Sequence, residues 1–164
     1  MAYQITSPLV GAQSIATTST TQNHPLGTIV TAKDPTYGGG EFIYLQGVAS
    51  TVVGSIVEYN TSFATGLETT ALAEPQPNAV AMSINVAGPN YGWYQIGGNA
   101  IVTKANTVSF AADAPVCAAA GLGIAVVSGL ALNGAIVAVV ASAKSDVTTV
   151  QVMIDRPSGP HDVS

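Results

Sequence analysis

The sequence predicts a single all-β domain. Its 164 residues are enough for one domain with a sizeable core. Seventeen glycines and nine prolines divide the chain into short segments, several of them rich in Val, Ile and Thr. Long runs of the helix-forming residues Glu, Lys, Leu and Arg are absent.

The chain divides into an N-terminal arm (1–23), a β domain (24–157) and a C-terminal tail (158–164). The arm has low complexity and no sustained apolar period, so alone it cannot offset the entropy of ordering. It is either a flexible tail or a segment that becomes ordered on a partner. The candidate contact residues in the arm are Gln13, Ile15, Thr17, Thr20 and Gln22.

Three strands are expected in the first part of the β domain. They cover residues 27–32, 41–46 and 55–59, which are rich in β-branched and aromatic residues. The segment 33–40 is the loop between the first two. Residues 60–78 form a long polar connection ending in a proline-rich stretch, where the backbone is extended but cannot join a sheet.

A hairpin-like run follows. Residues 79–86 alternate, which places Val80, Met82, Ile84 and Val86 on one face of a strand. After a turn at 89–92, the segments 93–96 and 100–104 are expected as strands joined by a turn at 97–99. On the simplest interpretation, 79–86 pairs with the strand that begins at Trp93.

The region 111–143 is long and apolar enough to suggest a membrane helix, but its glycines interrupt it. Short strands at 116–120, 123–127 and 136–141 are the preferred interpretation. The last strand covers 147–154, with Val150, Val152 and Ile154 inward, and ends at Arg156-Pro157.

Charge is sparse and excludes several partners. Charged residues make up 8% of the chain, the net charge is −5, and residues 114–143 carry no charge. The cations Lys33, Lys104, Lys144 and Arg156 are too few and scattered for nucleic acid or an anionic membrane surface. Because soluble domains average about 25% charged residues, we expect much of the surface to contact other protein, including copies of the chain itself.

The sequence offers little chemistry. It contains no Gly-x-Ser-x-Gly elbow and no phosphate-binding loop. The single Cys117 lies between apolar neighbours, and His24 and His161 lie near opposite ends, so no local zinc motif exists. Asp34 and Glu41 are expected on a solvated turn. We therefore predict a protein without enzymatic activity, cofactor or metal.

Aromatic residues offer a second set of candidates. Trp93, Tyr94, Tyr91 and Tyr44 either pack in the core or anchor an interface, and Tyr37 is a further candidate contact. We expect Trp93 to lie inside the domain or an oligomer interface. In the alternative interpretation, a carbohydrate- or receptor-binding module, Trp93 and its tyrosine neighbours form an exposed sugar platform.

Two blocks of the chain resemble small decoration, or cement, proteins of tailed-bacteriophage heads. The first runs from His24-Pro-Leu-Gly-Thr-Ile-Val-Thr-Ala-Lys-Asp34 through Gly40-Glu-Phe-Ile-Tyr-Leu-Gln-Gly-Val-Ala-Ser-Thr51. The second runs from Val80-Ala-Met-Ser through Tyr91-Gly-Trp-Tyr-Gln-Ile96, and a third, weaker element is Ile154-Asp-Arg-Pro157.

The resemblance covers about a third of the chain. It implies a jelly-roll-like or barrel-like domain that acts without catalysis. Such a protein would form a homo-oligomer, a trimer or dimer, on the outer surface of the capsid in the virion. There it would bind the phage major capsid protein and tie capsomers together.

Overall fold

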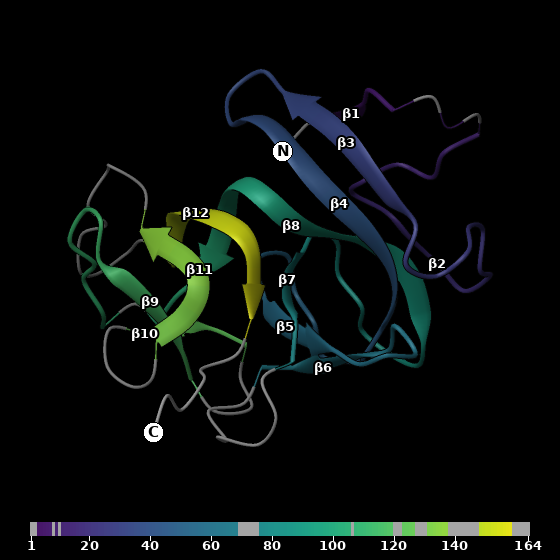
Figure 1. Cartoon of the computed structure of the whole chain (residues 1–164). Helices are drawn as coiled ribbons and strands as arrows, with labels where there is room; N and C mark the ends of the chain where they lie inside the picture. Colours follow the sequence, from purple (N-terminus) through teal and green to yellow (C-terminus); the bar gives the residue numbers. More distant parts are fainter. Residues whose placement is uncertain are drawn as a thin grey trace.

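The structure is a computed structural model that describes residues 3–7, 9, 11–68, 76–105, 107–119, 123–126, 131–137 and 148–158. These residues form twelve strands and no helix (Figure 1). In chain order the strands are β1 (Gln4–Ile5), β2 (Thr18–Ser19), β3 (Ile29–Asp34), β4 (Gly38–Gly47), β5 (Ile56–Tyr59), β6 (Thr65–Leu67), β7 (Asn78–Ala81), β8 (Asn90–Thr103), β9 (Pro115–Ala118), β10 (Ala125–Val126), β11 (Ala131–Val137) and β12 (Thr149–Ser158).

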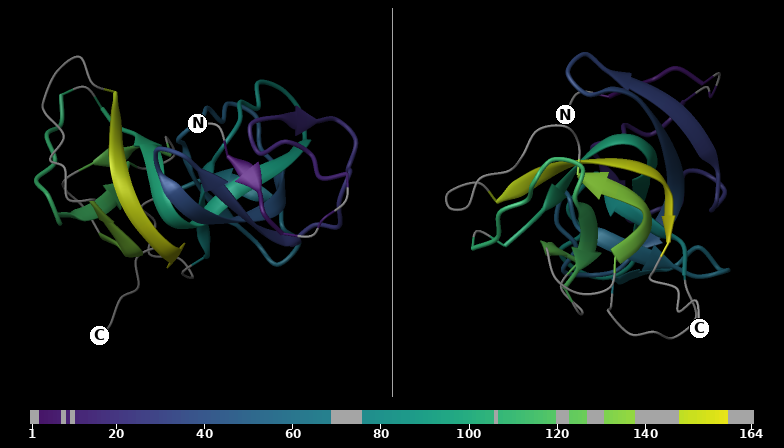
Figure 2. Two further views of the ribbon diagram at one scale, coloured as in Figure 1. Left: turned by 90° about the horizontal axis from the view of Figure 1, so that it is seen from above. Right: turned by 60° about the vertical axis from the view of Figure 1, so that its left-hand side comes forward.

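The all-β prediction is confirmed, and the sheet is open. Its main path runs β1-β3-β4-β8-β12-β11-β9-β10, with β2, β5, β6 and β7 attached beside it. All the pairings between these strands are antiparallel. Figure 2 shows β9–β12 gathered at one end of the molecule and β1–β4 at the other. The expected closure into a barrel does not occur along this path.

Strand β8 joins the two ends. One of its edges pairs with β4, and it also pairs with β2, β7 and β12 at successive positions. The predicted hairpin with a turn at 97–99 is therefore wrong, because the chain continues through these residues as one strand. A bulge replaces the turn: Phe42 faces Gln95 while Glu41 faces Gly97, which leaves Ile96 as the extra residue.

Gln95 stabilises this irregularity. Its side chain is fully buried, and its amide nitrogen donates to the carbonyls of Gly97 (3.1 Å) and Asn99 (2.9 Å). Gly98 adopts a φ of 91°, and a Cβ there would collide with the carbonyl oxygen of Gly39. Glycine is thus required at residue 98 by both its dihedral angle and its close neighbour.

Other strand predictions have mixed outcomes. Val80 and Ala81 pair with β8 as expected, but the strand ends at Ala81. The predicted common face is therefore wrong: Val80 and Met82 are buried, whereas Ile84 and Val86 are exposed. The predicted inward face of the last strand is confirmed by buried Val150, Val152 and Ile154. That strand extends to Ser158, beyond the predicted end.

Several predictions lie partly outside the described residues. These concern residues 69–75 of the connection predicted at 60–78, the strands expected at 120, 127 and 138–141, and the tail from 159. In the described part of that connection the prediction is wrong, because residues 65–67 form β6 and Asn78 begins β7. Among the described residues, no helix is long and apolar enough to cross a membrane.

Three clusters of buried side chains fill the molecule. The largest lies between β8 and the C-terminal strands and includes Val102, Val152 and Phe110. A second surrounds Trp93, between β3, β4 and the N-terminal segment. A third covers the opposite face of β4 and β8, where Ile43 and Tyr94 meet β5 and β7.

The N-terminal segment packs against its own domain. β1 extends the sheet by pairing with β3, and β2 pairs with β8. Ile15 is buried in the cluster around Trp93, 2% exposed. Residues 11–23 thus differ from an arm that is ordered only on a partner, because contacts within the chain already hold them.

Candidate functional site

Gln13 is the centre of the contacts that hold the N-terminal segment. Its amide nitrogen donates to the carbonyls of Thr17 (2.7 Å) and Tyr91 (3.1 Å). Its amide oxygen accepts from the Tyr44 hydroxyl (3.0 Å) and the Asn23 amide (2.9 Å). The role of Gln13 in this structure is therefore to fix residues 11–23 on the sheet.

Trp93 lies beneath this segment and is fully buried, as predicted. Its indole N–H donates to the carbonyl of Gln13 over 2.9 Å. The Tyr44 ring packs edge-on against the indole, with centroids 5.0 Å apart. His24 contacts both rings, and its Nε2 accepts from the backbone N–H of Gln13 (3.1 Å). Because no face of the indole reaches solvent, Trp93 does not form a sugar platform.

The other predicted contact residues fall into two groups. Ile15 and Tyr94 are buried, and Tyr94 lies in the cluster on the opposite face of β8 from Trp93. Thr17, Thr20 and Gln22 are exposed on the N-terminal segment, and Tyr37 is half-buried in the turn after β3. The structure therefore brings Gln13, Ile15 and Trp93 together inside the domain.

Two connections present a separate apolar surface, which we call the aliphatic ridge. It consists of Val52 and Val53, which precede β5, and Ile84 and Val86, which lie between β7 and β8. Their exposed fractions are 46%, 43%, 54% and 78% respectively. Sequence alternation places Ile84 and Val86 on the same strand face as Val80 and Met82, but only Val80 and Met82 are buried in the structure.

The aliphatic ridge rests on a buried polar base. Thr51 and Asn85 form an antiparallel bridge and are both fully buried. The Asn85 N–H donates to the Thr51 carbonyl (2.9 Å), and Asn90 donates to the Asn85 side-chain oxygen (2.7 Å). Since residues neighbouring a bridge point to the opposite side, Val52 and Ile84 face outward together. The ridge is thus held in place by hydrogen bonds rather than by its own packing.

The surroundings of the ridge carry no charge in the sequence. Neither 42–57 nor 76–103 contains Asp, Glu, Lys or Arg. Exposed aliphatic side chains in an uncharged surface cost little to desolvate when another apolar surface covers them. These two uncharged runs were the sequence signal that could have located the ridge.

Metal-binding, thiol and buried carboxyl groups were the remaining candidates for chemistry in the described residues. They contain no group of three His, Cys, Asp or Glu side chains that could hold a metal ion. Cys117 is buried, and burial raises the pKa of its thiol. Glu68 is also buried: desolvation raises the pKa of its carboxyl to about 7, against the opposing effect of the hydrogen bond from Asn78.

Comparison with known proteins adds no relative: no protein-family model, no curated protein and no solved structure matches this chain.

Proposed function

We propose that this chain is a non-enzymatic capsid decoration protein that binds the outside of a phage head and stabilises contacts between capsomers of the major capsid protein. The observation that carries the proposal is the aliphatic ridge, whose flanking segments 42–57 and 76–103 contain no charged residue. The resemblance of residues 24–51 and 80–96 to phage cement proteins supports the same function.

The small size of the ridge favours attachment through many identical contacts, as on a partner built from repeated subunits. A stable pairwise interface buries about 800 Å² on each partner. Four half-exposed aliphatic side chains, at about 1 kcal/mol each, supply about 4 kcal/mol before the cost of association. That corresponds to a dissociation constant of about 1 mM or weaker. Many linked copies, as in a homo-oligomeric trimer or dimer on a symmetric shell, would convert such weak contacts into stable attachment.

The charge distribution supports the same kind of partner. A free monomer relies on charge to remain dispersed, and only 8% of this chain is charged. If another protein covers the aliphatic ridge and its uncharged flanking segments, this part of the surface no longer needs charge to prevent aggregation. With Trp93 buried, the alternative of a receptor-binding module has no aromatic platform at this residue.

Cosedimentation with expanded, empty phage heads that lack their own decoration protein tests the proposal. The wild-type chain should bind saturably, in a fixed ratio to the major capsid protein. The double variant Ile84→Asp/Val86→Asp places two carboxylates on the ridge and should weaken binding at least tenfold. Both positions lie in exposed connections, so the domain should still fold.

The matched control is Ile29→Asp, which adds a carboxylate at another exposed aliphatic residue, 45% exposed on β3. It should bind like the wild type. Failure of the wild-type chain to bind heads, or equal loss in the control, would reject the ridge as the attachment surface. Light scattering checks the oligomer: a dispersed monomer at all concentrations would contradict the expected trimer or dimer.

A further inference from the structure

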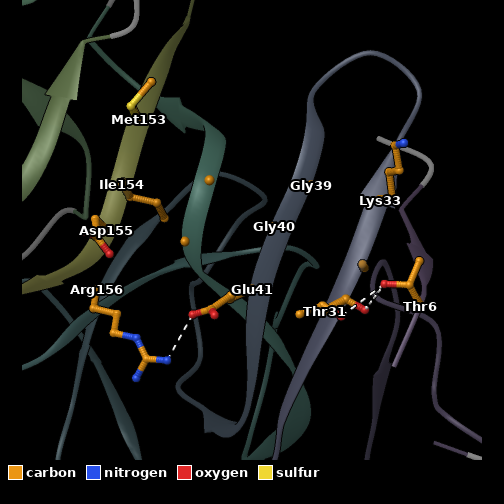
Figure 3. Close-up of a pocket in the computed structure, with 13 residues that line it drawn as sticks. Thr6, Thr31, Lys33, Gly39, Gly40, Glu41, Met153, Ile154, Asp155 and Arg156 are labelled. Carbon is orange, nitrogen blue, oxygen red and sulfur yellow. Dashed lines mark hydrogen bonds and ion pairs between the residues drawn. The ribbon is translucent and has the colours of Figure 1, made fainter. Parts of the chain in front are cut away.

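A hollow lined by both apolar and polar groups crosses the sheet where β3, β4, β8 and β12 lie side by side (Figure 3). It has a volume of about 670 Å³, within the usual range for small-molecule sites, about 300–1,000 Å³. The pairings Thr31–Glu41, Glu41–Gly97 and Gly97–Asp155 place these residues in one row across the four strands. We propose that this hollow is a binding site for a neutral saccharide.

At two glycines of the floor the fold would tolerate a Cβ atom. A Cβ at Gly39 would meet nothing within 4 Å, and one at Gly97 would make an ordinary contact of 3.4 Å with Glu41. Neither residue has a positive φ. Since neither backbone conformation nor packing requires glycine here, the absence of side chains serves to keep the hollow open.

Arg156 is the second unusual feature. It has a φ of 45°, a left-handed conformation that is unfavourable for a residue with a side chain. Its guanidinium reaches over the hollow to Glu41, 3.1 Å away, as Figure 3 shows. The Arg156 and Glu41 side chains are 62% and 41% exposed, and exposed ion pairs stabilise a fold only slightly. Arg156 lies in an irregularity of the β11–β12 pairing, where Asp155, Arg156 and Pro157 face the single residue Gly134, and this accounts for its left-handed backbone. The same geometry presents the Arg156 and Glu41 side chains, two planar polar groups, side by side.

The lining chemistry selects a neutral, hydroxyl-rich ligand. Lys33 and Arg156 balance Glu41 and Asp155, so the hollow has no net charge. Carboxylate and guanidinium groups each offer two parallel hydrogen-bonding atoms, which match adjacent hydroxyls of a sugar. The Thr6 and Thr31 hydroxyls lie 3.1 Å apart on one wall and can donate or accept.

A peptide strand fits less well than a saccharide. Strand addition requires an open sheet edge with unpaired backbone groups. Here the floor is the face of a sheet whose four strands pair with one another along the row. Recognition must therefore come from side chains and from the shape of the hollow.

NMR titration of the ¹⁵N-labelled chain with lactose, maltose and chitobiose tests the proposal. At least one disaccharide should shift the amide signals of Gly39, Gly97 and Asp155, with a dissociation constant of about 1 mM. Sodium acetate and acetyl-Gly-Gly-amide are the comparison ligands. No shift at these amides with any of the three sugars, or equal shifts with acetate or the peptide, would overturn it.

Two variants locate the site. Gly39→Leu places a branched side chain in the hollow at a residue whose Cβ would meet no atom within 4 Å, and it should abolish the shifts. Asp155→Asn should weaken binding about tenfold while the fold is unchanged. Thr20→Leu adds the same side chain to an exposed residue outside the hollow and should bind like the wild type. Unaltered binding by Gly39→Leu would exclude the hollow. Because no phage head is used, this result is independent of the attachment surface.

Discussion

Replacing Gln13 with alanine should destabilise the domain far more than its place in a polar, low-complexity segment suggests. The Gln13 side chain makes four hydrogen bonds, of which those with Tyr44 and Tyr91 are partly buried. Each partly buried bond contributes about 1 kcal/mol and each exposed bond less. The Tyr44 hydroxyl also loses an acceptor. We therefore expect Gln13→Ala to lower the free energy of unfolding by about 2–3 kcal/mol.

Urea denaturation and thermal melting measure this loss. For a chain of this length, the expected change lowers Tm by about 5–10 °C. Fluorescence offers a second measurement, since Trp93 is the sole tryptophan and is covered by the Gln13 backbone. Its emission should shift to longer wavelength if the segment detaches.

Gln22→Ala is the matched control, because Gln22 is an exposed glutamine of the same segment. It makes one side-chain hydrogen bond, to the His24 carbonyl (3.0 Å). This variant should lose only about 0.5 kcal/mol. Equal losses in the two variants would refute the idea that Gln13 fixes the segment.

Three further predictions concern other parts of the molecule. Gly98→Ala should lower the free energy of unfolding by more than about 1 kcal/mol, because residue 98 has a positive φ and its Cβ would collide with Gly39. Gly39→Ala should change this free energy by less than about 1 kcal/mol, as measured by urea denaturation. Equal losses in the two variants would contradict the bulge geometry. Burial raises the pKa of Glu68 from 4.5 to about 7, so the folded chain binds this proton more tightly than the unfolded chain, and the unfolding free energy should fall as pH rises between these values. Glu68→Gln should flatten that part of the stability profile, and an unchanged profile would show that the carboxyl is not responsible. Burial also raises the pKa of the Cys117 thiol, so this residue should react with a thiol reagent only after denaturant is added; rapid labelling of the native chain would contradict its burial.

The local sequence pattern was sufficient to predict strands in which apolar residues are contiguous or alternate without interruption. The strands predicted at 27–32 and 147–154 are examples, because residues 29–32 and 149–154 lie in β3 and β12. The loop predicted at 33–40 is too long, since β3 continues to Asp34 and β4 begins at Gly38. The burial of Trp93 was also predictable, since a lone large aromatic in a strand seldom remains exposed. The composition alone indicated the all-β class.

The pattern was insufficient where tertiary contacts decide the backbone path. Two consecutive glycines and an asparagine predict a turn at 97–99, but the same residues permit a bulge when Gln95 can bond the freed carbonyls. The position of residues 11–23 depends on hydrogen bonds from Gln13 to residues as distant as Tyr91, and no local period reports such contacts. The aliphatic ridge was missed because alternation was extended past the end of β7.

The dependence of both ends of the sheet on β8 has a consequence for folding during synthesis. The partner of β8 on the C-terminal side, β12, begins 46 residues after β8 ends, at Thr149 following Thr103. Such non-local pairing slows folding, because the ends of the intervening chain segment must first come together at an entropic cost. When the ribosome has made only the first 89 residues, Tyr44 and Phe42 have no β8 to cover them. Nascent chains of this protein should therefore expose an apolar surface until β8 emerges, and recruit chaperones during that interval.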